Sequence, residues 1–220
     1  MTAFTLIELL VVIAIIAVLA AIAFPVARSA MTTGSKAKDV GNLRSIAACV
    51  LLFTSENGNR LPGPVFRSTR DERFPNSTNY IAGWLDRAGY IPKGGDVWKS
   101  PARYVTNHVY ILNNSRDSDP EEFFGNVNPR RDPRAMAALK ANVASNPAVT
   151  NAPTLAGLWM VTNGDGENYG PGTQGATAPH AADVRTPWGG RNYVFFDGSV
   201  KFFPRTTPST YPSSGQGNHK

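Results

Sequence analysis

The most apolar part of the chain is the run from Leu6 to Phe24, in which Glu8 is the one ionisable residue. About 20 apolar residues in a helix cover the hydrocarbon core of a bilayer, so this run predicts a membrane-spanning helix. A carboxylate close to hydrocarbon costs on the order of 2.5–3.5 kcal/mol on insertion scales, and such a group normally has a partner or a task. Glu8 is therefore a candidate functional residue within the span.

The helical pattern continues beyond Pro25, because proline kinks a helix without necessarily ending it. Apolar residues then recur at the spacings of an amphipathic helix: Val40, Leu43, Ile46, Val50 and Phe53. The charged residues fall mostly elsewhere on the helical wheel: Lys36, Lys38, Asp39 and Arg44. Gly58 predicts a left-handed cap and Pro62 enforces the end. A continuous helix from Phe4 to Asn57 would be about 80 Å long.

The rest of the chain contains short runs rich in β-branched and aromatic residues, which predict strands. These runs are Tyr104 to Leu112, Leu158 to Thr162, Arg191 to Phe196 and Ser199 to Phe203. The last two flank Asp197-Gly198, the strongest short hairpin signal in the chain.

The segments between these runs are rich in turn-forming residues. We expect a surface loop over Asp117 to Pro133, because it is polar and interrupted by prolines. Asp132 as cap and Pro133 in the first turn predict a short helix over Arg134 to Val143. A further loop is expected over Asn146 to Pro153.

Together these elements predict an α+β fold, in which a long N-terminal helix packs on a small antiparallel β-sheet head. The expected order along the chain has five parts. They are a short leader (1–3), a transmembrane helix (4–25), its amphipathic continuation (26–57), a globular β-rich head (58–205) and a disordered tail (206–220).

The start of the helix carries a recognisable motif. Phe4-Thr5-Leu6-Ile7-Glu8-Leu9 followed by Val11-Val12-Ile13-Ala14-Ile15-Ile16 resembles the start of type IV pilins and type II secretion pseudopilins. In that family the precursor is cut before the Phe on the cytoplasmic side, and the new amine is methylated. The resemblance implies that Ala3 precedes the cut and that Phe4 becomes the terminus. It also implies that Glu8 pairs with the Phe4 amine of a neighbouring subunit in a helical filament.

The resemblance implies a structural subunit rather than an enzyme. The implied partners are identical or homologous subunits, a prepilin peptidase, an inner-membrane assembly platform with its cytoplasmic ATPase, and membrane lipid. The implied location is a single pass through the bacterial inner membrane, with the head in the periplasm or on the cell surface. Whether the filament is a pseudopilus or a pilus stays open at this point.

Three further blocks resemble a group of pseudopilin-like proteins common in planctomycete and verrucomicrobial genomes. These blocks are Asn42-Leu43-Arg44-Ser45-Ile46 with Glu56 to Pro62, Trp84 to Ala102, and Trp188 to Gly198. Many members have Cys where this chain has Ser100, so any disulfide found there is absent here. Cys49 is the only cysteine, which excludes an intrachain disulfide.

Two other interpretations of the N-terminal segment remain. Ala21-Ile22-Ala23 has the form of a signal-peptidase site, which would make the mature protein begin at Phe24. A plain membrane anchor would leave Met1 in place. The sequence also departs from the usual pilin leader, since Ala3 replaces the usual Gly and the leader has no basic residue. The first positive charges follow the span, which by the positive-inside rule favours the opposite orientation.

Composition adds little that is specific. The formal net charge of +6 would suit nucleic acid or anionic lipid. However, the 22 Lys and Arg are scattered, and the densest run, Arg130 to Arg134, is interrupted by Asp132 and Pro133. A solvated surface is therefore favoured over a nucleic-acid interface.

One stretch resembles a calcium loop, Asn163-Gly164-Asp165-Gly166-Glu167-Asn168, because it combines oxygen ligands with glycines. It lacks the downstream glutamate of an EF-hand, and a glycine-rich turn with Asx hydrogen bonds is the alternative. Major pseudopilins bind calcium in a carboxy-terminal loop, so the resemblance also implies calcium as a candidate cofactor. Asp165 and Glu167 are the first ligands to test.

No catalytic motif is present: there is no Gly-x-Ser-x-Gly elbow, no His-Glu-x-x-His and no phosphate loop. We therefore expect no enzyme. The alternative function is a membrane-anchored domain outside the cytoplasm, which uses the helix only as an anchor. Such a domain would hydrolyse a substrate or bind carbohydrate on exposed tryptophans, and the candidates are Trp84, Trp98, Trp159 and Trp188.

Overall fold

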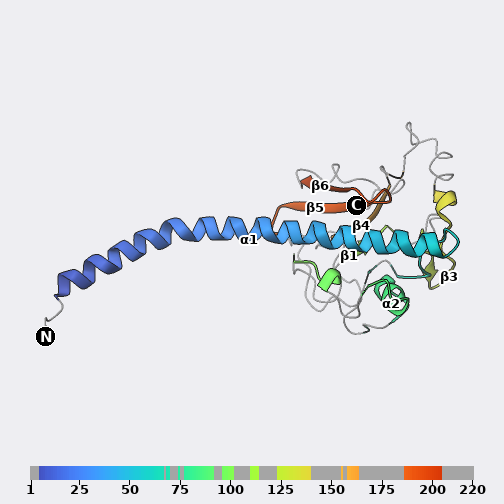
Figure 1. Cartoon of the computed structure of the whole chain (residues 1–220), viewed down its shortest axis with the longest axis horizontal. Coiled ribbons are helices and arrows are strands. Elements are labelled where there is room, and N and C mark those ends of the chain that lie inside the picture. Colours follow the sequence, from blue (N-terminus) through green and yellow to red (C-terminus); the bar gives the residue numbers. More distant parts are fainter. Residues whose placement is uncertain are drawn as a thin grey trace.

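The computed structural model describes residues 5–66, 68, 69, 74, 77–91, 96–101, 110–113, 123–139, 155, 158–163 and 186–204. One long helix, α1 (Leu6–Glu56), runs through the whole molecule, and its second half is embedded in the head (Figure 1). The described residues thus have the α+β, pilin-like architecture that the sequence predicts.

Helix α1 passes through Pro25 without a break and comprises 51 residues. At 1.5 Å per residue it is about 77 Å long, and it is visibly curved in its first half (Figure 1). Its C-terminal end matches the prediction, because Gly58 has a φ of 65° and the N–H of Asn57 donates to the carbonyl of Phe53 over 3.0 Å. Asn59, with a φ of 57°, extends this left-handed turn.

The head is built on a four-stranded antiparallel sheet with the order β1-β4-β5-β6. Its strands are β1 (Tyr110–Leu112), β4 (Trp159–Asn163), β5 (Gly190–Phe195) and β6 (Val200–Pro204). The predicted hairpin is confirmed, since β5 and β6 pair directly around Asp197-Gly198. The prediction of a strand near 158–162 is confirmed as well.

Smaller elements surround this sheet and helix. They are the helix α2 (Ile81–Arg87), the 3-10 turn η1 (Asp96–Trp98), and the two-stranded hairpin of β2 (Asn126–Val127) and β3 (Arg130–Arg131). No local sequence pattern predicted α2, η1 or the β2–β3 hairpin. Of the short helix predicted over 134–143, the described part contains one helical turn at 136–139.

The core lies between the second half of α1 and one face of the sheet. Leu43, Ile46 and Val50 of α1 are buried there in one cluster with Met160 and Val161 of β4. The pairing of β4 with β5 is irregular between Trp159 and Val161. Because of this irregularity, Met160 and Val161 both face the helix although they are adjacent in the strand. On the other side of the sheet, Trp159, Tyr193, Phe195 and Phe203 form a separate aromatic cluster.

Two sequence predictions are wrong in the head. Asp39 is completely buried, although the prediction grouped it with the charged residues off the apolar stripe; it lies four residues before Leu43 and seven before Ile46, on the same face of the helix. The segment 117–133 is not simply a surface loop, because Phe123 and Phe124 lie in the core and β2–β3 follows them. In both places the partners of the buried side chains are distant in the sequence.

Candidate functional site

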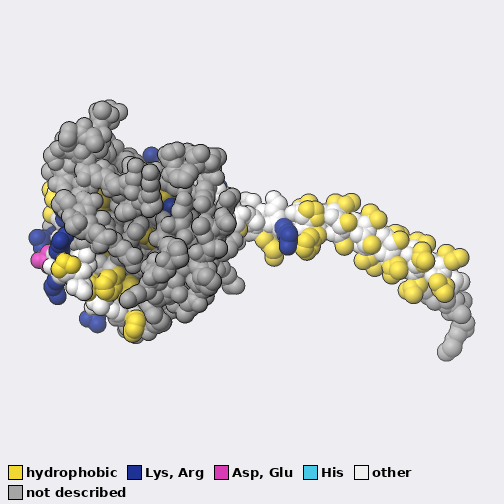
Figure 2. Space-filling view, turned by 180° about the vertical axis from the view of Figure 1, so that it is seen from behind, with side chains coloured by type: hydrophobic (Ala, Val, Ile, Leu, Met, Phe, Trp, Pro, Cys, Tyr) yellow, Lys and Arg dark blue, Asp and Glu magenta, His cyan; other side chains and the backbone are white. Residues whose placement is uncertain are grey.

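The first half of α1 is the largest apolar surface that the described residues leave uncovered. Every residue from 5 to 31 is exposed, and apolar side chains cover the rod that projects from the head (Figure 2). Even Val12, the least exposed of the large apolar side chains in this half, is 46% exposed. A helix that is apolar all round is normally a membrane span or the interior of an assembly. Within the described part of the chain, α1 is the one helix long and apolar enough to cross a membrane.

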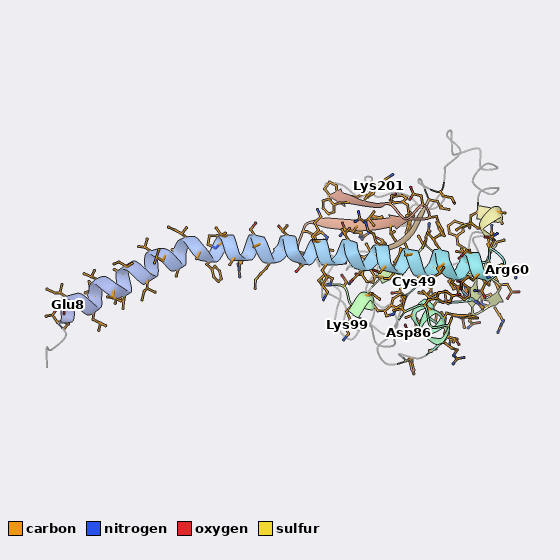
Figure 3. All side chains as sticks on the ribbon, viewed as in Figure 1. Glu8, Cys49, Arg60, Asp86, Lys99 and Lys201 are labelled. Atoms are coloured by element: carbon orange, nitrogen blue, oxygen red, sulfur yellow. The ribbon has the colours of Figure 1, made fainter. Side chains whose placement is uncertain are left out.

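Glu8 lies at the far end of this rod from the head (Figure 3). Its carboxylate forms a capping box with Thr5, the residue that caps α1. The backbone N–H and the hydroxyl of Thr5 both donate to Oε2 of Glu8 over 2.8 Å. The N–H of Glu8 donates in return to Oγ1 of Thr5 over 3.3 Å. Both contacts to the carboxylate use Oε2, so Oε1 of Glu8 accepts no hydrogen bond from the described residues.

The other residues predicted for processing and calcium binding lie outside the part of the chain that the structure describes. Ala3 and Phe4 lie outside the described residues, so the processing site and its amine stay predictions. Asp165 and Glu167 also lie outside them, and calcium binding there remains a prediction. The neighbouring Asn163 is described, and its side chain faces the core, where its Nδ2 donates to Asp39. Among the described residues, no group of three or more His, Cys, Asp or Glu side chains forms a metal site.

Residues 26–38, which we call the neck, connect the apolar half of α1 to the head. The neck carries the cations Arg28, Lys36 and Lys38. The Arg28 guanidinium lies 4.9 Å from the centre of the Phe24 ring, and the Lys36 Nζ lies 3.3 Å from that of Phe202 in β6. Such contacts are attractive and keep the charged ends close to the apolar span and the head.

A buried polar cluster lies where α1 enters the head, and sequence reasoning did not predict it. Oδ1 of Asp39 accepts hydrogen bonds from the hydroxyls of Ser100 and Tyr110, each over 3.0 Å, and from Nδ2 of Asn163 over 2.7 Å. Oδ2 accepts from Nδ2 of Asn163 over 2.8 Å and from Nδ2 of Asn192 over 2.7 Å. The cluster therefore ties α1 to β1, β4 and β5.

Asn42, one turn along α1, extends this cluster. Its Nδ2 donates to the carbonyl of Lys99 over 3.1 Å and to the hydroxyl of Tyr110 over 3.3 Å. Asn42 and Asn192 come from two different parts of the chain, α1 and β5. Their common feature in this structure is that each fixes a buried polar contact of the helix–sheet junction.

The glycine pair before Asn192 also has a structural reason. Gly189 has a φ of 70°, which favours glycine. A Cβ on Gly190 would lie 2.3 Å from the carbonyl oxygen of Phe203, so a side chain there would push β6 away from β5. The pair thus allows β5 to begin close to β6 and to present Asn192 to α1.

The tryptophans offer little open surface for carbohydrate stacking. Trp98 is completely buried and Trp159 is 5% exposed. Trp84 and Trp188 are half-buried, and Trp84 packs edge-on against Phe53. Cys49 is half-buried too, and its thiol donates to the carbonyl of Tyr90 over 3.4 Å.

Comparison with known proteins identifies the N-terminal segment. Residues 2–24 match the family described as the prokaryotic N-terminal methylation motif, the signature of type IV pilins and pseudopilins. No curated protein and no solved structure matches the chain. The motif and the exposed apolar helix support a pilin or pseudopilin type of subunit that is anchored in a membrane. The match ends at residue 24, so the similarity of the head to planctomycete and verrucomicrobial proteins stays a prediction.

Proposed function

We propose that this chain is the structural subunit of a type IV pilus-like or type II secretion pseudopilus filament. Before assembly, the first half of α1 spans the inner membrane and the head lies in the periplasm or on the cell surface. The single observation that carries the proposal is the uncovered apolar surface on all sides of residues 6–24. Exposure of such surface to water costs about 25 cal/mol per Å², so it requires lipid or the helices of other subunits.

The transfer of this half from lipid to a filament core gains little hydrophobic free energy, because lipid tails are as apolar as leucine. A specific polar contact is therefore needed to set the register of neighbouring subunits. Glu8 is the one ionisable side chain between Leu6 and Phe24, and the Phe4 amine of the next subunit is its proposed partner. A buried charge pair of this kind determines register more reliably than it adds stability.

The geometry around Glu8 supports this role. Thr5 holds Oε2 in the capping box, and Oε1, which accepts nothing from the described residues, is the proposed acceptor for a donor from another molecule. An amine that approaches Oε1 can pair with the carboxylate without opening the first turn of α1.

Substitution of Glu8 tests the proposal. Glu8→Gln retains an oxygen that can accept from the N–H of Thr5 but removes the charge. Glu8→Ala removes both the oxygen and the charge. The loss of one partner of a buried pair costs about 3–5 kcal/mol, so both variants should assemble at least about 100-fold less than wild type. Carbonate extraction should show that both variants still insert into membranes.

Glu56→Gln is the matched control, since Glu56 is an exposed carboxylate at the other end of the same helix, where it accepts a hydrogen bond from Tyr90. This variant should assemble like wild type. Normal quantities of sedimentable filament from Glu8→Gln would contradict docking through the charge.

The N-terminus of the mature protein provides a separate test of processing. Mass spectrometry of the membrane form should give a chain that begins at methylated Phe4. A chain that begins at Phe24 would indicate a cleaved signal peptide, and one that begins at Met1 would indicate a plain anchor. Either result would contradict the proposal.

A further inference from the structure

The cluster around Asp39 contains a buried carboxylate that no cation of the described residues neutralises. Asp39 is completely buried, and its contacts are hydrogen bonds from two hydroxyl groups and two carboxamides, all of them neutral. An ionised carboxylate inside a protein is costly unless it is paired with a cation, and such a group otherwise tends to bind a proton. Asp39 therefore has a physical reason to change its protonation state within the fold.

A protonated carboxyl group needs a hydrogen-bond acceptor, and the cluster contains one that is unused. Oδ1 of Asn192 is buried and has no hydrogen-bond partner among the residues that the structure describes. Its Nδ2 lies 2.7 Å from Oδ2 of Asp39. Rotation of the Asn192 carboxamide by half a turn would exchange these two atoms and place its oxygen against Oδ2.

The second carboxamide of the cluster has no such freedom. Oδ1 of Asn163 accepts from the backbone N–H of Asn192 over 2.8 Å, while its Nδ2 donates to both oxygens of Asp39. Reversal of Asn163 would break all three contacts. The proton-dependent change is therefore restricted to one pair, Asp39 of α1 and Asn192 of β5.

We propose that Asp39 and Asn192 form a proton-linked joint between helix α1 and strand β5. When Asp39 is ionised, Oδ2 accepts from Nδ2 of Asn192. When Oδ2 takes a proton from solvent, the new O–H donates to Oδ1 of the reversed Asn192 carboxamide. Only this proton is gained, and the contacts of Asp39 with Ser100 and Tyr110 persist in both states.

The direction of the pH effect follows from the burial of the carboxyl group. Burial raises the pKa of Asp39 above its ordinary value of 3.8, although the hydrogen bonds from Asn192, Asn163, Tyr110 and Ser100 act the other way. The folded head then binds the proton more tightly than the unfolded chain does. Its stability should increase as the pH falls through the folded pKa towards 3.8, and it should be lowest above the folded pKa.

Other titratable groups near Asp39 do not account for such a change. Tyr110 of β1 contacts Asp39, and burial raises the pKa of this phenol well above its ordinary range, so it stays neutral. On α1, Lys36 lies over the Phe202 ring and Lys38 is exposed. Lys99, beside Ser100, has an exposed side chain (Figure 3). On β4 and β5 the groups that face Asp39 are the carboxamides of Asn163 and Asn192.

The experiment compares unfolding of the full chain in detergent micelles for wild type and Asp39→Asn. The introduced amide imitates the protonated carboxyl, since it can donate to Oδ1 of Asn192 and still accept from Ser100 and Tyr110. The wild-type unfolding midpoint should rise as the pH is lowered from neutral towards 3.8, whereas that of Asp39→Asn should lose this rise. At about pH 8 the variant should be at least as stable as wild type.

Asp132→Asn is the control: Asp132 is exposed, so this variant should leave the wild-type rise intact. A carboxyl ¹³C titration, assigned by its absence in Asp39→Asn, should place the midpoint of Asp39 above 3.8. A midpoint at or below 3.8 would overturn the proposal, as would an Asp39→Asn variant that keeps the wild-type pH dependence. Neither readout depends on filament assembly, so failure here leaves the proposed function intact.

Discussion

The two halves of α1 share one continuous helix and have opposite environments. All side chains from residue 5 to residue 31 are exposed, whereas the second half buries a stripe that includes Leu43, Ile46 and Val50. The first half is apolar on every side and the second half on one side only. A one-sided stripe is satisfied by one sheet, but an all-round apolar surface requires apolar surroundings on all sides. The distribution of apolar side chains around a helix, rather than their number alone, therefore determines whether the helix needs one sheet or apolar surroundings on all sides.

The largest expected contrast is between two leucines of this helix. Leu43→Ala should lower the free energy of unfolding of the head by about 2–5 kcal/mol, because it leaves a cavity in the core. Leu43 is 0% exposed, whereas Leu19, in the first half, is 61% exposed. Denaturant unfolding of the full chain in micelles measures the effect.

Leu19→Ala is the matched control, and it should change the stability of the head by less than about 0.5 kcal/mol. Equal destabilisation by the two substitutions would mean that the first half also packs on the head. The contrast between the halves would then be lost.

A smaller effect is expected for the polar contacts of the junction. Asn42→Ala should destabilise the head by about 1–3 kcal/mol, because it removes a donor to the carbonyl of Lys99 and to the hydroxyl of Tyr110. Ser45→Ala, on the exposed side of the same turn, removes only a bond to the carbonyl of Gly41 within the helix and should be nearly neutral. Thermal unfolding measures the stability of both variants. An equal loss of stability in the two would show that the contacts of Asn42 do not stabilise the junction.

The smallest effect concerns the neck, which joins the apolar span to the head. Gly34→Ala should stabilise the helix there by about 1 kcal/mol, because alanine is the better helix former. A Cβ at Gly34 meets nothing within 4 Å. Hydrogen exchange of the neck amides should slow by about fivefold. Unchanged or faster exchange in this variant would show that the neck is not held by helix propensity.

The sequence was most informative where the decisive interactions are local. The continuation of α1 through Pro25, the cap at Gly58 and the hairpin at Asp197-Gly198 depend on neighbouring residues, and the structure confirms all three. The N-terminal motif is equally local, and the match at residues 2–24 confirms it. Glu8 could be singled out from sequence because a lone carboxylate in an apolar run needs an explanation.

Sequence reasoning failed where distant segments meet. Asp39 was grouped with the charged residues off the apolar stripe because of its charge, although its spacing from Leu43 places it on the buried face, and its donors come from residues 100, 110, 163 and 192. No local pattern reveals such a set. Phe123 and Phe124 were missed for the same reason, since a polar stretch preceded them and their packing partner Phe196 is far along the chain. The division of the chain into leader, span, head and tail stays a prediction.

The central claim is that Glu8 docks on the Phe4 amine of another copy of this chain, and a cross-link between isotope-labelled copies tests it most directly. Subunits with ¹⁴N and ¹⁵N are assembled together, and a lipid-soluble carbodiimide joins carboxylates to adjacent amines. If Glu8 docks in this way, mass spectrometry should find a cross-linked peptide in which Glu8 from a copy with one isotope is bonded to Phe4 from a copy with the other. A bond that forms only within copies of one isotope, or an N-terminus other than Phe4 in the assembled protein, would contradict it.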